Sequence, residues 1–125
     1  MYDIIIIGSG PAGLTAAIYA SRAQMTAVVL EKDYLGSGQI AVSEQVDNYP
    51  GLPGIDGYTL GEKFREHAEH LGAKFENVEV DHIEQTAEGF TVFCKEGEPL
   101  QSRTILCASG TSYGRLNVPG GTLQG

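Results

Sequence analysis

The chain has 125 residues, of which 42% are hydrophobic and 19% charged, with 8 Lys and Arg against 16 Asp and Glu. This length is typical of one domain, and the hydrophobic fraction can bury a core, which excludes wholesale disorder. A net charge of −8 argues against a nucleic-acid partner, because phosphate contacts need clustered basic side chains and those here are scattered. An anionic ligand would therefore have to be held by backbone dipoles.

No segment has the pattern of a targeting signal or a membrane span. The first apolar run, residues 4–7, is too short to cross a membrane and lacks the basic flank and cleavage site of a secretory signal. We therefore expect a cytoplasmic protein with no membrane partner. Cys94 and Cys107 stand outside any Cys-x-x-Cys or metal-ligand spacing, and we expect both to be small buried residues.

The beginning of the chain predicts a strand, a helix and a second strand. Residues 2–7 form a β-branched run that ends at Gly8, which is typical of a strand buried on both faces in a parallel sheet. Pro11 suits the first turn of a helix, and apolar residues at helical spacing continue this helix to Ala23. Residues 25–30 predict the second buried strand, which completes a strand–helix–strand unit.

A long loop and an amphipathic helix are predicted next. Residues 33–57 are rich in Gly, Ser, Pro and polar residues, and so long a loop inside a compact domain is usually functional or disordered. Thr59 and Glu62 match a capping box. The apolar stripe that follows predicts a helix that ends at Gly72 and lies on a sheet.

The rest of the chain predicts β structure and a tail. Residues 74–84 alternate as one strand, and residues 89–94 and 100–107 flank a turn, as in a hairpin. The last of these strands should run back into the core. Residues 109–125 are rich in Gly and polar residues without periodicity, and they predict a linker that leads out of the domain.

The junction of the first strand and the first helix carries the clearest chemical signal. Residues 8–13 match G-x-G-x-x-G, placed after a strand and at the start of a helix, where this pattern binds dinucleotides. Gly8 permits the tight turn, Gly10 lets a diphosphate approach the backbone, and Gly13 lets the helix pack closely on the strand. Free amides of the helix then hold the phosphates. Glu31, which ends the second strand, can accept hydrogen bonds from the adenosine ribose hydroxyls and disfavours a 2′-phosphate.

One alternative is a glycine turn in an unrelated α/β protein, with Glu31 merely a solvated strand end. We favour the dinucleotide site, because the strand, the helix, the second strand and the acidic residue are all in place. The fingerprint leaves open whether the dinucleotide is FAD or NAD, since both use the same adenosine diphosphate seat.

Several separated segments match one protein family in order. They are residues 3–23, 38–40, 46–51, 64–68 and 108–110, the last followed by residues 118–120. From Tyr2 to about Gly120, the chain resembles the thioredoxin reductase family of flavoproteins in its low-molecular-weight bacterial form, class II of the pyridine-nucleotide disulfide oxidoreductases.

The resemblance implies an α/β fold of three layers, a Rossmann-like FAD/NAD(P)-binding fold with a parallel central sheet and a small antiparallel β-hairpin insertion. Residues 1–110 would form the N-terminal part of the FAD-binding domain, and residues 111–125 a linker toward a missing NADPH domain. The implied cofactor-binding residues are Gly8, Ser9, Gly10, Pro11, Ala12 and Gly13 at the diphosphate; Glu31 at the adenosine ribose; Gly38, Gln39 and Asn48 toward the flavin; Val80 at the adenine; and Ala108, Ser109 and Gly110 where the chain passes the cofactor. Lys32 is a further candidate for cofactor binding.

Gln39 and Asn48 also suit this role by their own chemistry. Both lie in the long loop, and a side-chain amide can donate to and accept from the mixed edge of an isoalloxazine ring. The alternative for each is an amide that satisfies its own turn.

The sequence departs from the family pattern in three places. Ser37 precedes Gly38 where the family usually has a glycine, and Ser109 replaces a threonine. The larger departure is the absence of the NADPH domain with its redox Cys-x-x-Cys and of the Gly-Asp segment that completes the FAD domain. We therefore expect no catalytic residue and no metal site in this chain, and no disulfide turnover by the chain alone.

In the full enzyme the implied chemistry is hydride transfer from NADPH to FAD, followed by electron transfer to a cysteine pair and to thioredoxin or a similar small redox protein. Two alternatives stay open: a self-standing FAD- or ADP-binding module without turnover, and an NAD-dependent Rossmann protein. Because the family completes its FAD domain with a later segment, we also expect an exposed apolar edge or face that favours a homodimer or self-association.

The histidines carry weaker signals. His67 and His70 lie three apart on the predicted helix, but the neighbouring Glu66 and Glu69 favour a solvated face over a metal site. His82 lies in an acidic stretch, and we expect it to be a surface residue rather than a base.

Overall fold

The structure is a computed structural model that describes residues 1–32, 51 and 54–108. Most of the predicted loop and the whole predicted linker lie outside these residues. The described elements are β1 (Tyr2–Ile7), α1 (Pro11–Arg22), β2 (Ala27–Glu31), α3 (Gly57–His70), β3 (Lys74–Asn77), β4 (Val80–Gln85), β5 (Phe90–Cys94) and β6 (Leu100–Cys107). The predicted site residues outside the described ranges are Gly38, Gln39, Asn48, Ser109 and Gly110.

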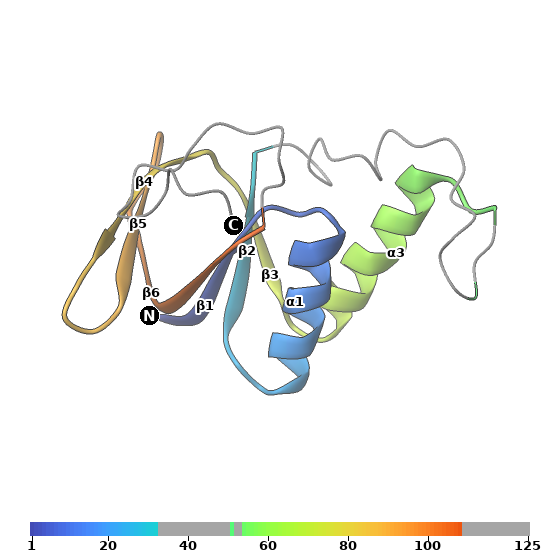
Figure 1. The fold of residues 1–125 in the computed structure, drawn as a ribbon, viewed down its shortest axis with the longest axis horizontal. Helices are drawn as coiled ribbons and strands as arrows, with labels where there is room; N and C mark the ends of the chain where they lie inside the picture. Colours follow the sequence, from blue (N-terminus) through green and yellow to red (C-terminus); the bar gives the residue numbers. More distant parts are fainter. Residues whose placement is uncertain (33–50, 52–53, 109–125) are drawn as a thin grey trace.

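A six-stranded sheet in the order β3-β2-β1-β6-β5-β4 connects all the described strands. The strands from β3 to β6 in this order run parallel, and β5 and β4 continue the sheet antiparallel. Figure 1 shows α1 and α3 on one side of the parallel strands and the β4–β5 hairpin on the other. The predicted three-layer α/β fold with a parallel central sheet and a hairpin insertion is confirmed.

The second half of β1 and all of β2 are buried, which explains the uninterrupted apolar runs of residues 5–7 and 27–30. Ile5 and Ile7 belong to the core cluster that includes Val92 of the hairpin. Ile6, between them, belongs to the cluster with Ala17 of α1 and Ala68 of α3. Because successive side chains of a strand point to opposite faces, a strand covered on both sides needs an apolar residue at every position.

The prediction of one strand over residues 74–84 was wrong. β3 pairs with β2 at one edge of the sheet, whereas β4 pairs with β5 at the other edge. The chain crosses between them at Val78 and Glu79. The amide of Val78 donates to the carbonyl of Glu31 (3.0 Å), and the carbonyl of Glu79 accepts from the amide of Lys95 (2.9 Å). These partners are distant in sequence, so the local alternation of apolar residues does not reveal the break.

The predicted capping box of α3 was also wrong, because Asp56 is the N-cap. Its carboxylate accepts from the hydroxyl of Thr59 (2.7 Å) and from the amide of Thr59 (2.8 Å). These two bonds favour the ionised form and lower the pKa of Asp56. The helix ends as expected, since Gly72 has a φ of 106° just after the C-cap residue Leu71.

The expected burial of the cysteines was wrong as well. Cys94 is half-buried and Cys107 is exposed, and partial burial raises the pKa of both thiols. Cys107 ends β6, whose described pairing with β5 covers only residues 100–102. Leu106 beside it is 37% exposed, so this end of β6 presents apolar surface. In the part of the chain that the structure describes, no helix is long and apolar enough to cross a membrane.

The contact between α1 and β1 generates a test of the fold. A Cβ on Gly13 would lie 2.0 Å from the carbonyl oxygen of Gly8, which is backbone and cannot rotate away. We expect Gly13→Ala to lower the free energy of unfolding by about 2 kcal/mol or more, although Ala is favoured over Gly inside a helix by about 1 kcal/mol. Urea unfolding measures this change, and an unchanged or higher stability would contradict the close contact.

Candidate functional site

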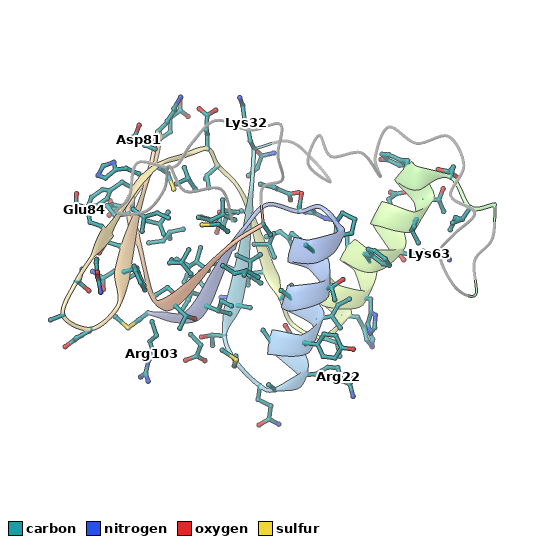
Figure 2. The ribbon with its side chains drawn as sticks, viewed as in Figure 1. Arg22, Lys32, Lys63, Asp81, Glu84 and Arg103 are labelled. Carbon is teal, nitrogen blue, oxygen red and sulfur yellow. The ribbon has the colours of Figure 1, made fainter. Side chains whose placement is uncertain are left out.

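The described candidate site residues lie where the parallel strands end. Gly8 follows β1, and its amide donates to the carbonyl of Leu30 in β2 (2.9 Å). Ala108 follows β6, and its amide donates to the carbonyl of Ile7 (2.8 Å). Figure 2 shows Lys32, just after β2, at this carboxyl edge of the sheet, whereas Arg22 and Arg103 lie toward the opposite edge. Ligands of open α/β sheets bind at the carboxyl edge.

The turn between β1 and α1 leaves the start of the helix open. Gly8 has a φ of 113°, which a residue with a Cβ rarely adopts. Gly10 is the N-cap residue and makes no side-chain cap, and the first turn of α1 has Pro11 and no acidic residue. A Cβ on Gly10 would meet no atom of the described residues within 4 Å. The positive end of the helix dipole therefore faces an accessible position, which suits an anion.

Ser9 adds an unsatisfied donor to this turn. The residue is 1% exposed, and its Oγ has no hydrogen-bond partner among the described residues. A buried hydroxyl without a partner is costly, and a phosphate oxygen is an acceptor that would satisfy it. The residues of the turn therefore fit a diphosphate group.

Glu31, at the end of β2, is paired within the protein. Its side chain is 3% exposed, and Oε2 lies 2.5 Å from Nη1 of Arg65 in α3. Sequence reasoning assigned no role to Arg65, because it lies 34 residues from Glu31 and no short-range pattern connects them. The segment that contains Arg65 was noted only as a match to the family.

Glu79 fixes the start of β4 to the end of β2. Its carboxylate lies 2.8 Å from Nζ of Lys95 and 2.9 Å from Nζ of Lys32. Hydrogen bonds from Lys95 and then from Lys32 lower the pKa of Glu79 to about 2. Val80 follows directly, so this predicted site residue is held near the carboxyl edge of the sheet by ion pairs that the sequence did not reveal.

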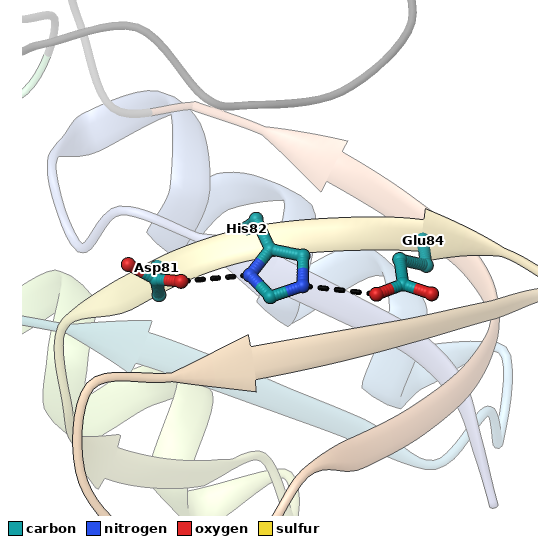
Figure 3. Close-up of polar contacts among 3 residues, drawn as sticks. All are labelled: Asp81, His82 and Glu84. Carbon is teal, nitrogen blue, oxygen red and sulfur yellow. Dashed lines mark hydrogen bonds and ion pairs between the residues drawn. The ribbon is translucent and has the colours of Figure 1, made fainter.

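His82 lies between two carboxylates at the surface of the hairpin (Figure 3). Nδ1 is 2.7 Å from Oδ2 of Asp81, and Nε2 is 3.0 Å from Oε2 of Glu84. The ring stacks on Phe93, with the ring centroids 4.5 Å apart. The register of β4 on β5 shifts between Val80 and His82, so Asp81 is the extra residue of a bulge and can reach its neighbour. The hydrogen bonds to Asp81 and then to Glu84 raise the pKa of His82.

Histidines elsewhere do not gather with other ligands. His67 and His70 are exposed on α3. In the described ranges, no three side chains of His, Cys, Asp or Glu are grouped so that they could hold a metal ion.

The fold is a Rossmann-like α/β domain, and comparison with known proteins gives its family. The model of the pyridine nucleotide-disulphide oxidoreductase family matches residues 2–125. The chain belongs to this family.

Individual relatives agree with this assignment. The chain is 38% identical to thioredoxin reductase from Bacillus subtilis over 120 residues, which are 96% of the chain and 37% of that protein. It is 40% identical to the bifunctional thioredoxin reductase/thioredoxin from Mycobacterium leprae, over 96% of the chain and 26% of that protein. The crystal structure of thioredoxin reductase from Streptococcus pyogenes superposes with a TM-score of 0.85 at 36% identity, over 96% of the chain and 39% of that structure.

The chain thus spans between about a quarter and two fifths of the length of these relatives. The activities in their names belong to the longer proteins. What the matched part of this chain does within such an activity follows from its own residues.

The cluster around His82 generates a pH prediction. A raised pKa in the folded state means that protonated His82 stabilises the fold below its ordinary pKa of 6.5, and that this stabilisation disappears as the pH rises through the folded-state pKa. We expect His82→Gln to lose more stability relative to the wild type at pH 5.5 than at pH 9, measured by urea unfolding. In a Glu84→Gln background, which lacks one of the two carboxylates, the loss caused by His82→Gln should differ less between the two pH values. An equal loss at both pH values would contradict the prediction.

Proposed function

We propose that the chain binds FAD through its adenosine diphosphate half, as the N-terminal cofactor-binding portion of a flavoprotein oxidoreductase. The observation that carries this proposal is the open, uncapped start of α1 at Gly10, with the buried hydroxyl of Ser9 beside it and Glu31 at the end of the next strand. Main-chain amides rather than basic side chains then hold the diphosphate. This explains how a chain with a net charge of −8 takes an anionic ligand.

Different described residues bind different parts of this cofactor. The turn from Gly8 to Gly13 binds the diphosphate, and Glu31 accepts the hydroxyls of the adenosine ribose. Val80 and Ala108 border the cofactor at the same edge of the sheet. Gln39 and Asn48, with Gly38, Ser109 and Gly110, complete the proposed site from outside the described residues.

When bound, FAD supplies the electron transfer, and the protein binds and orients it. We further propose that the longer protein passes electrons from NADPH through FAD to a cysteine pair and on to thioredoxin or a similar small redox protein. The description of the family supports a pyridine nucleotide and a disulphide in this route, and the names of the relatives from Bacillus subtilis and Mycobacterium leprae support thioredoxin as the acceptor. We also propose that the protein acts in the cytoplasm. We further propose that it self-associates, which the 37% exposure of the apolar Leu106 near the end of β6 supports.

Nucleotide titration tests the proposal. We expect the full chain to bind FAD and ADP in calorimetry. It should bind FAD more tightly than NADH, because Gly38, Gln39 and Asn48 are proposed to contact the flavin, which NADH lacks. Tighter binding of NADH would favour an NAD-dependent Rossmann protein instead. If the chain binds none of the three nucleotides, the proposed function is overturned.

A substitution at Gly10 separates binding from stability. The φ of −74° and the open space beside Gly10 accept a side chain, and Ser is a better N-cap than Gly. The hydroxyl of Gly10→Ser would bond to the amides that the diphosphate needs. We expect unchanged or higher stability and an affinity for ADP lower by about tenfold or more, as for the loss of charge-assisted hydrogen bonds. Thr15→Ser, on the exposed side of α1, is the control, and undiminished ADP affinity in Gly10→Ser would contradict the proposal.

A further inference from the structure

Arg65 connects three elements below the carboxyl edge of the sheet. Its side chain extends from α3, is only 14% exposed, and bonds to Oε2 of Glu31 at the end of β2. The guanidinium also lies 4.0 Å from the ring centroid of Phe75 in β3, and its Nε is 3.2 Å from Oε1 of Glu69. The ring of Phe75 therefore restricts the plane of the guanidinium group, and the side-chain oxygens of Glu31 and Glu69 restrict the directions of its N–H groups.

The cost of burying this ion pair points to a role beyond stability. Both partners lose water, and buried ion pairs are often no more stabilising than apolar side chains of the same volume. The core clusters next to this position consist of apolar residues that pack without charges. A nucleotide also brings negative charge to this edge, and the guanidinium offsets the repulsion between that charge and Glu31.

We propose that Arg65 is a positioning residue that holds the carboxylate of Glu31 in the orientation that accepts the adenosine ribose hydroxyls. This inference rests on the proposed function. Arg65 does not itself contact the nucleotide, and it acts through Glu31. Its effect therefore appears in the recognition of the ribose hydroxyls and not only in the stability of the fold.

Selectivity between ADP and 2′,3′-dideoxy-ADP isolates this effect, because the two ligands differ only in the hydroxyls. Calorimetric titrations of the full chain with both ligands give one ratio of dissociation constants for each variant. We expect the wild type to favour ADP by about tenfold, the size typical of hydrogen bonds to a charged group. In Glu31→Gln and in Arg65→Met this preference should fall to about twofold.

Two control variants define what counts as positioning. Arg22→Met removes an arginine from α1, where Arg22 lies over Tyr19 and away from the carboxyl edge. Glu69→Gln removes the charge of a side chain that is 53% exposed, but it keeps a side-chain oxygen that can accept from Nε of Arg65 and leaves Glu31 in place. Both variants should keep the wild-type preference for ADP. Arg65→Lys keeps the charge without the planar fork, so its preference should fall between those of the wild type and Arg65→Met.

Each result decides between the inference and its alternatives. A preference for ADP that persists in Arg65→Met would make the ion pair structural and overturn the inference, while ADP binding itself would leave the proposed function standing. If thermal melts show that Arg65→Met does not fold, Arg65→Lys answers the same question, and an unchanged ratio overturns the inference. Equal binding of the two ligands by the wild type would also overturn it. Loss of all nucleotide binding by the wild type would overturn the inference and the proposed function together.

Discussion

The close contact between the start of α1 and the end of β1 determines the rest of the site. Gly13 lies so near the carbonyl of Gly8 that no side chain fits between them. This contact sets how far the helix stands from the sheet and brings the amino end of α1 level with the carboxyl ends of β1, β2 and β6. With a larger residue at this position, the helix would have to move away from the sheet, and its amino end would lie farther from the edge where Glu31 and Ala108 lie.

Three carboxylates of this acidic chain are paired with groups that the fold brings close to them. Glu31, Glu79 and Asp56 each have a defined partner: a guanidinium, two ammonium groups, and the amide and hydroxyl of Thr59. Glu31 and Glu79, at the carboxyl edge of the sheet, are thus paired with cations, while the first turn of α1 carries no acidic residue. An anion that approaches the turn therefore meets the positive end of the dipole of α1, with no competing carboxylate in the first turn of this helix.

Sequence predicted the parts of the fold that depend on neighbours in the chain. The apolar run from Ile4 to Ile7, the glycine pattern after it and the turn after Cys94 specify local structure, and all three have the predicted form. The split between β3 and β4, the cap at Asp56 and the partner of Glu31 were missed. The split depends on which edge of the sheet each half joins, and the ion pair joins residues 34 positions apart. The cap was missed because Asp and Thr are both good N-cap residues, and the backbone geometry of the helix start decides which residue takes this position.

The position of β1 has a consequence for how the chain is made. β1 pairs on one side with β2, which follows soon after it, and on the other side with β6, where Tyr2 is opposite Ser102. During synthesis the first strand therefore waits for the last described strand to leave the ribosome before both of its edges are paired. For that interval a run of four isoleucines has an open hydrogen-bonding edge, which is the kind of segment that chaperones protect from aggregation.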